Sequence, residues 1–198
     1  MRKLKIFEHI SLDGVIQIRG SGEIDGDYPY GDWTAPYRTP AGRDVVLALH
    51  GESFDLLLGR RTYDLWSGFW PKAPSSPLSD GINAATKYVA THRPESLEWG
   101  PFEGLGPDIV ADIRRIKSHN GPDLILWGSS TLTSTLLEHG LADEVLLFVY
   151  PVLLGKGKRL FADGTPPRAF ELASTNALSS GIVINAYKAV GPLTQPRT

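Results

Sequence analysis

A chain of 198 residues, 41% hydrophobic and 21% charged, is long enough to bury a core and has the composition of a soluble globular protein. A formal charge of −2 gives no general field for nucleic acid or an anionic membrane, so any anion site must be local. The absence of cysteine excludes disulfides and thiolate metal sites, and it is typical of a cytoplasmic protein.

The pattern of residues 1–14, MRKLKIFEHISLDG, is not the one expected of a signal peptide, and no window approaches the ~18 apolar residues of a membrane helix. We therefore expect no membrane partner. Residues 3–10 predict a first strand, which Ser11 to Gly14 break before Val15-Ile16 resume an extended path. Residues 17–40 form a long segment rich in glycine, aspartate, proline and aromatic residues, which we interpret as a folded flap.

Further elements follow in chain order. Apolar periodicity predicts helices over 41–52, from about Thr62, over 108–119 and over 131–139. Apolar runs predict strands over 54–58, 87–91, 124–127 and 144–155, then two closing strands over 169–174 and 182–190. Alternating strands and helices, followed by two successive strands, predict an α/β fold with a mostly parallel sheet and antiparallel C-terminal strands. We expect one domain over 1–190 and a flexible tail over 191–198.

The stretch LILWGSSTL, residues 124–132, contains the first candidate site. A buried strand stops at Gly128, three hydroxyl residues follow, and a helix begins near Thr131. Such a turn offers free backbone N–H groups and the positive end of a helix, both suited to a phosphate. An ordinary helix N-cap is the alternative, because serine and threonine are common capping residues.

A second turn of the same kind occurs in LLLGRRTYD. Here a buried strand ends at Gly59, and Arg60 and Arg61 add two permanent positive charges beside Thr62. Two exposed surface arginines are the alternative interpretation. Because the carboxyl ends of parallel strands share one edge, both turns are expected at the ligand-binding edge of the sheet. A nucleotide with several phosphates is the natural candidate.

Other motifs do not support a different chemistry. GSGEIDG neither follows a convincing strand nor opens a helix, and no Walker or G-x-S-x-G motif occurs. The five histidines show no paired metal spacing, so we predict no metal site.

Several segments, in order, resemble the dihydrofolate-reductase-like family: ISLDGVI (10–16), LLLGRRTYDLW (56–66), KYVATH (87–92) and the run from LWGSSTL to GKGKRLF (126–161). The resemblance is greatest to the reductase domain of riboflavin-biosynthesis deaminase–reductases and their stand-alone relatives. It implies a three-layer fold with an eight-stranded sheet, an NADPH cofactor, and pairing as a homodimer. It also implies cofactor-binding residues at Gly14, Val15, Gly59, Arg60, Arg61, Thr62, Thr91, His92, Gly128, Ser129, Ser130 and Thr131.

The expected activity is hydride transfer from NADPH to a small planar heterocyclic or carbonyl substrate. Trp33 and Tyr37 would close the substrate pocket with Asp32 nearby, and Asp13 would act as the catalytic proton donor, with Asp32 or water as alternatives. The family's usual substrate carboxylates are not evident, since Leu126 and Trp127 precede the strand-end glycine. Two alternatives to the enzyme remain: a catalytically inactive nucleotide-binding protein and a dimer that sequesters a ligand.

Overall fold

The computed structural model describes residues 1–18, 28–161 and 163–193. Within these ranges eight strands form one sheet in the order β4-β3-β2-β5-β1-β6-β8-β7. The strands β1 to β6 run parallel, and β8 is antiparallel to both β6 and β7. The prediction of a mostly parallel sheet with antiparallel C-terminal strands is therefore confirmed.

The strands, in chain order, are β1 Leu4–Ser11, β2 Phe54–Gly59, β3 Lys87–Ala90, β4 Phe102–Leu105, β5 Asp123–Trp127, β6 Glu144–Tyr150, β7 Arg168–Ala177 and β8 Val183–Pro192. The α-helices are α1 Pro40–His50, α2 Arg60–Phe69, α3 Pro77–Ala84, α4 Ile109–Ser118 and α5 Ser130–Glu138. Short 3-10 turns cover Ala35–Tyr37, Trp70–Lys72 and Pro94–Ser96. No described helix is long and apolar enough to cross a membrane.

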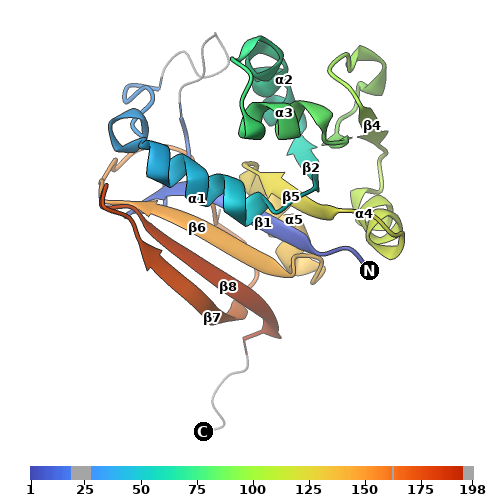
Figure 1. Cartoon of the computed structure of the whole chain (residues 1–198). Coiled ribbons are helices and arrows are strands. Elements are labelled where there is room, and N and C mark those ends of the chain that lie inside the picture. The colour runs from blue at the N-terminus through green and yellow to red at the C-terminus, as the bar shows by residue number, and fades with distance from the viewer. Residues whose placement is uncertain (19–27, 162, 194–198) are drawn as a thin grey trace, which may run out of the picture.

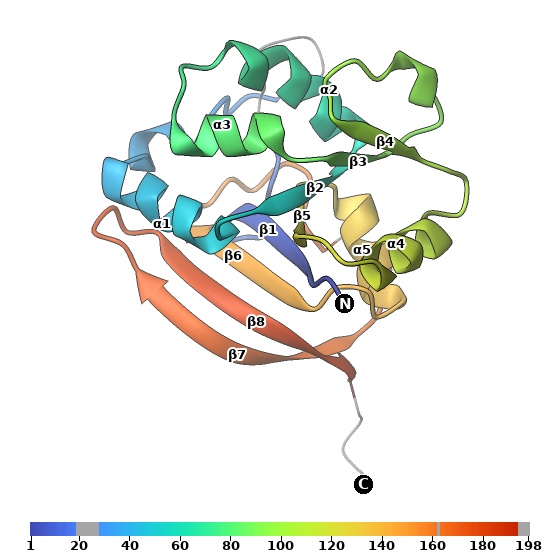
Figure 2. The ribbon, with the colours of Figure 1, turned by 45° about the vertical axis from the view of Figure 1, so that its right-hand side comes forward.

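Helices cover both faces of the sheet, so the fold has three layers (Figure 1). On one face, apolar side chains of α1, α2 and α3 pack over Phe7, Leu56 and Phe148. On the other face, α4 and α5 pack over Leu4 and Ile6. The β7–β8 hairpin lies at the edge of the sheet opposite β4 (Figure 2).

The central strands were predicted well because they are mostly apolar: in β2 all six residues are buried, and only Asp55 is charged. Two elements were missed. Helix α3 begins at a proline and contains Gly81, so it lacks a clear helical period, and a capping box between Ser76 and Ser79 starts it. Strand β4 has four residues, includes Gly104 and lies at the sheet edge. Strand β8 continues to Pro192, so it includes the first two residues assigned to the tail.

Candidate functional site

The two strand-to-helix turns lie side by side. Strands β2 and β5 are parallel neighbours, so Gly59 and Gly128 leave the sheet at the same edge. A Cβ added to Gly59 would lie 3.0 Å from the Oγ of Ser129, and one added to Gly128 would lie 3.1 Å from the Oγ1 of Thr62. Each glycine thus leaves room for a hydroxyl side chain of the other turn, and the two turns form one unit.

The second turn has an unusual backbone. Gly128 and Ser129 have φ values of 70° and 66°, a left-handed conformation that is costly for serine. The Oγ of Ser129 accepts a hydrogen bond from the N–H of Leu132 at 3.3 Å, so Ser129 is the N-cap of α5. The capping interpretation is therefore correct for this side chain. The hydrogen bond from Leu132 to Ser129 still leaves the positive end of α5 at the surface of the turn, where an anion is favoured.

A cavity of about 570 Å³ opens at this edge of the sheet. Its lining includes ten of the twelve residues predicted to bind the cofactor: Gly59, Arg60, Arg61, Thr62, Thr91, His92, Gly128, Ser129, Ser130 and Thr131. Residues 16–18 and Lys158 also line it. These residues come from five separate segments of the sequence, which are thus brought around one space.

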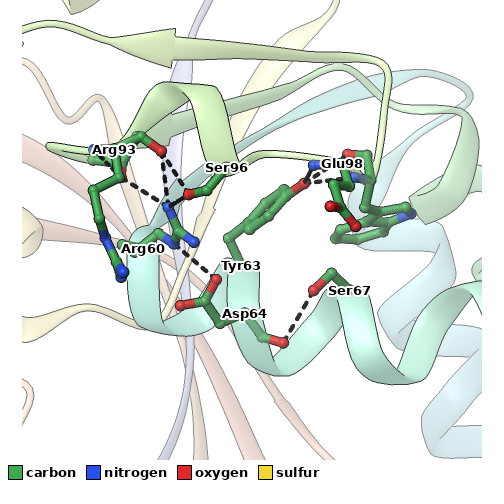
Figure 3. Close-up of polar contacts among 9 residues, drawn as sticks. Arg60, Tyr63, Asp64, Ser67, Arg93, Ser96 and Glu98 are labelled. Atoms are coloured by element: carbon green, nitrogen blue, oxygen red, sulfur yellow. Dashed lines mark hydrogen bonds and ion pairs between the residues drawn. The ribbon is translucent and has the colours of Figure 1, made fainter.

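Arg60 is already engaged by the protein (Figure 3). Its guanidinium donates to the Oδ1 of Asp64 at 2.8 Å, to the carbonyl of Arg93 at 3.0 Å and to the Oγ of Ser96 at 2.7 Å. These bonds tie the start of α2 to the loop that follows β3. Arg60 therefore shapes the cavity wall, whereas Arg61 is an exposed side chain of the same wall.

Helix α2 has a second attachment to the same region of the chain. The hydroxyl oxygen of Tyr63 accepts hydrogen bonds from the backbone N–H groups of Glu98 and Trp99 at 2.9 and 2.6 Å (Figure 3). Because Tyr63 is buried, these bonds hold α2 against the segment between β3 and β4. Helix α2 is thus joined to the segment of chain that follows Thr91 and His92.

The predicted residues of the first loop lie elsewhere. Asp13 accepts hydrogen bonds from the hydroxyl of Ser11 at 2.6 Å and from the N–H groups of Leu154 and Gly155 at 3.2 and 2.7 Å. These bonds, that of Ser11 first, lower the pKa of Asp13 to about 2, so it carries no proton at neutral pH. This geometry favours a turn-forming role for Asp13 over proton donation. Gly14 and the fully buried Val15 are outside the cavity lining, while the next three residues are part of it.

The predicted substrate residues form a separate group. The rings of Trp33 and Tyr37 both pack against Tyr150, with centroids 5.2 and 5.6 Å away. Asp32 forms an ion pair with Arg38 at 2.6 Å and accepts a bond from the hydroxyl of Thr34. None of the three predicted residues lines the 570 Å³ cavity. Trp33 is nevertheless linked to it, because its Nε1–H donates to the carbonyl of Gln17 at 2.8 Å.

The structure adds His9 to this aromatic group. Its ring lies 5.2 Å from Trp127 and 5.1 Å from Phe148, and its Nδ1 is 3.1 Å from the hydroxyl of Tyr150. Burial, with the nearby charge of Arg38, lowers the pKa of His9 to about 4, and burial raises the pKa of Tyr150 to about 12. Both groups are therefore neutral at neutral pH and form an uncharged donor–acceptor pair.

Glu8 is an acidic residue of the cavity that was not among the predicted site residues. It lies on the central strand β1, is 5% exposed and lines the cavity beneath Gly128. Burial raises the pKa of its carboxyl group to about 8, against the smaller opposing effect of the backbone amides of His9 and Gly128. The signal in the sequence was a carboxylate at a position where strand alternation requires an apolar residue.

Comparison with known proteins agrees with the architecture. Residues 2–184 match the family described as the RibD C-terminal domain. Uncharacterized protein YyaP of Bacillus subtilis (strain 168) is 29% identical over 136 residues, which are 67% of this chain and 72% of that protein.

Two solved structures share the fold at low sequence identity. A pyrimidine reductase-like protein from Corynebacterium diphtheriae NCTC gives a TM-score of 0.63 at 14% identity, covering 96% of this chain and 92% of the other. Dihydrofolate reductase from Enterococcus faecalis, complexed with NADP(H) and RAB-propyl, gives a TM-score of 0.59 at 15% identity, covering 95% and 96%. The chain has the dihydrofolate-reductase-like fold and belongs to the RibD C-terminal domain family.

Proposed function

We propose that this protein is an NADPH-dependent reductase that acts on a small planar heterocyclic or carbonyl substrate. The observation that carries the proposal is one cavity lined by both strand-to-helix turns, with three arginines and the start of α5 on its wall. Membership in a family of reductase domains of riboflavin-biosynthesis enzymes supports an oxidoreductase. When bound, the reduced nicotinamide supplies the hydride.

The residues of the cavity fit a dinucleotide with an extra phosphate. The start of α5, from Gly128 to Thr131, would hold the diphosphate through backbone N–H groups. Arg61, with Thr91 and His92, would hold the phosphorylated adenosine, for which a forked cation is well suited. Residues 16–18 would border the nicotinamide. In this arrangement Arg60 does not bind the cofactor but holds the cavity wall in place between the α5 turn and the residues around the adenosine.

The aromatic group on the other face of β1 is the proposed substrate site. Trp33, Tyr37 and Tyr150 offer ring faces and edges against which a flat substrate can pack. The neutral pair of His9 and Tyr150 would donate and accept hydrogen bonds at the edge of an uncharged heterocycle. Because Asp13 is held ionised and Asp32 is paired with Arg38, we favour water as the proton source.

Turnover tests this proposal directly. Purified protein is incubated with NADPH and a panel of planar heterocycles, quinones and carbonyl compounds, and loss of the reduced-nicotinamide absorbance is followed. At least one acceptor is expected to oxidise NADPH with saturation. Micromolar NADPH binding by calorimetry without turnover on any acceptor would instead favour the inactive nucleotide-binding alternative.

We further propose a homodimer that pairs through β7 and β8. The apolar side chains of Leu172 and Val190 on this hairpin and of Leu193 directly after it are 53%, 65% and 60% exposed. Burying such side chains against a second copy would remove apolar surface from water. Light scattering during gel filtration measures the mass of the assembly.

A further inference from the structure

One oxygen of the Glu8 carboxyl group is buried without a hydrogen bond, although buried polar atoms normally form one. Its Oε1 accepts a hydrogen bond from the N–H of His9 at 3.0 Å. Its Oε2 is buried, and no described residue forms a hydrogen bond of ordinary geometry to it. The nearby backbone amide of Gly128 only slightly lowers the pKa of the carboxyl group. Leaving a buried polar atom unsatisfied is unfavourable, so a ligand that supplies the missing partner is favoured there.

The position of this oxygen indicates which part of a ligand it would contact. A Cβ added to Gly128 would lie 4.0 Å from the Oε2 of Glu8 and 3.1 Å from the Oγ1 of Thr62. The unpartnered oxygen therefore lies directly against the turn that is proposed to hold the diphosphate. Glu8 also lines the same cavity as that turn.

The protonation state of Glu8 decides what it can do at this position. With its pKa raised to about 8 by burial, Glu8 is mainly a neutral acid at pH 7 and has an O–H group to donate. A neutral acid does not repel a phosphate, whereas an ionised carboxylate in a low-dielectric site would. The other charged or titratable side chains on the cavity wall are Arg60, Arg61, His92, Arg93 and Lys158.

We propose that Glu8 contacts the bound dinucleotide as a neutral hydrogen-bond donor, so that NADPH binds only to the form in which Glu8 is protonated. This inference rests on the proposed function, since it takes NADPH as the ligand. It makes cofactor binding proton-linked: binding keeps a proton on Glu8 that the free protein releases at alkaline pH.

Titration calorimetry with NADPH between pH 7 and pH 9.5 tests the inference. If only the protonated form binds, the wild-type affinity should fall about 30-fold over this range, given a free-protein pKa of about 8. Glu8→Gln, which is neutral at every pH and keeps a donor, should bind with an affinity that changes less than about threefold. Glu171→Gln on β7 removes an equal charge at an exposed position and should retain the wild-type pH dependence.

A second measurement needs no variant and covers the case in which Glu8→Gln fails to fold. Calorimetry in buffers of different ionisation enthalpy should show uptake of about 0.9 proton per NADPH at pH 9 by the wild-type protein. The phosphates of NADPH do not account for such uptake, because phosphomonoesters, with a second pKa of about 6, are already fully ionised at pH 9.

Two results would overturn the inference, and only the second would also overturn the proposed function. Binding of NADPH at pH 7 with the same affinity at pH 9.5 and no proton uptake would overturn the role of Glu8 while leaving the reductase proposal intact. Failure of both wild type and Glu171→Gln to bind NADPH at pH 7 would overturn both.

Discussion

Replacing Gly59 with alanine tests whether the two turns act as one unit. Gly59 has φ −70° and ψ 152°, which alanine adopts without strain, so the substitution changes only the space between the turns. The new methyl group would lie 3.0 Å from the Oγ and 3.2 Å from the Cβ of Ser129. Because Ser129 is fixed as the N-cap of α5, the turns must separate to relieve this contact.

The expected cost follows from that contact. Overpacking a fitted interior typically costs about 1–3 kcal/mol, so Gly59→Ala should lower the free energy of unfolding by this amount. Loss of one well-placed hydrogen bond to a phosphate, about 1.4 kcal/mol, should raise the Kd for NADPH about tenfold. Urea denaturation measures the first quantity, and titration calorimetry measures the second.

Gly68→Ala is the matched control, because it makes the same change near the other end of α2. A Cβ at Gly68 would have nothing within 4 Å, and alanine in a helix should stabilise by about 0.5–1 kcal/mol. Its Kd for NADPH should remain that of wild type. If Gly59→Ala matched Gly68→Ala in both stability and NADPH affinity, the turns would not be coupled, and the reasoning would be refuted.

Three further substitutions test other parts of the structure. Asp13→Asn should lower the free energy of unfolding at pH 7, measured by urea titration. Because folding lowers the pKa of Asp13, the stabilisation by its carboxylate is present above about pH 4 and is lost as the pH falls through about 2. An equal loss of stability at pH 7 and pH 2 would contradict this. Trp33→Phe removes the hydrogen bond to Gln17 and should lower the free energy of unfolding by about 1 kcal/mol and raise the Kd for NADPH measured by calorimetry. Unchanged affinity would show that Trp33 is not coupled to the cavity. Leu172→Glu should halve the mass measured by light scattering, and a mass unaffected by the substitution would argue against pairing through β7.

The parts of the site that sequence predicted well depend on local signals. An apolar strand, a glycine and a run of hydroxyl or basic residues identify a strand-to-helix turn from a few neighbouring positions. Parallel pairing then determines that such turns share an edge, which is why Gly59 and Gly128 were expected together. The apolar stripes of α1, α4 and α5 were likewise evident from their spacing.

What the sequence did not predict depends on contacts between distant segments. The role of Arg60 comes from the carbonyl of Arg93 and the hydroxyl of Ser96, whose approach requires the loop after β3 to fold over α2. Glu8 looked like an imperfect position in a strand, and only the packing of β1 beneath Gly128 makes it a buried acid in a cavity. Helix α3 and strand β4 are short and interrupted by glycine, so neighbouring elements stabilise them more than their own periodicity does.

A crystal structure of the protein soaked with NADPH is the most direct test of the cavity as a cofactor site. The diphosphate is expected at the start of α5, in contact with the backbone of Gly128 to Thr131 and facing the turn at Gly59. A dinucleotide bound elsewhere at full occupancy, or a cavity without density at saturating NADPH, would contradict it.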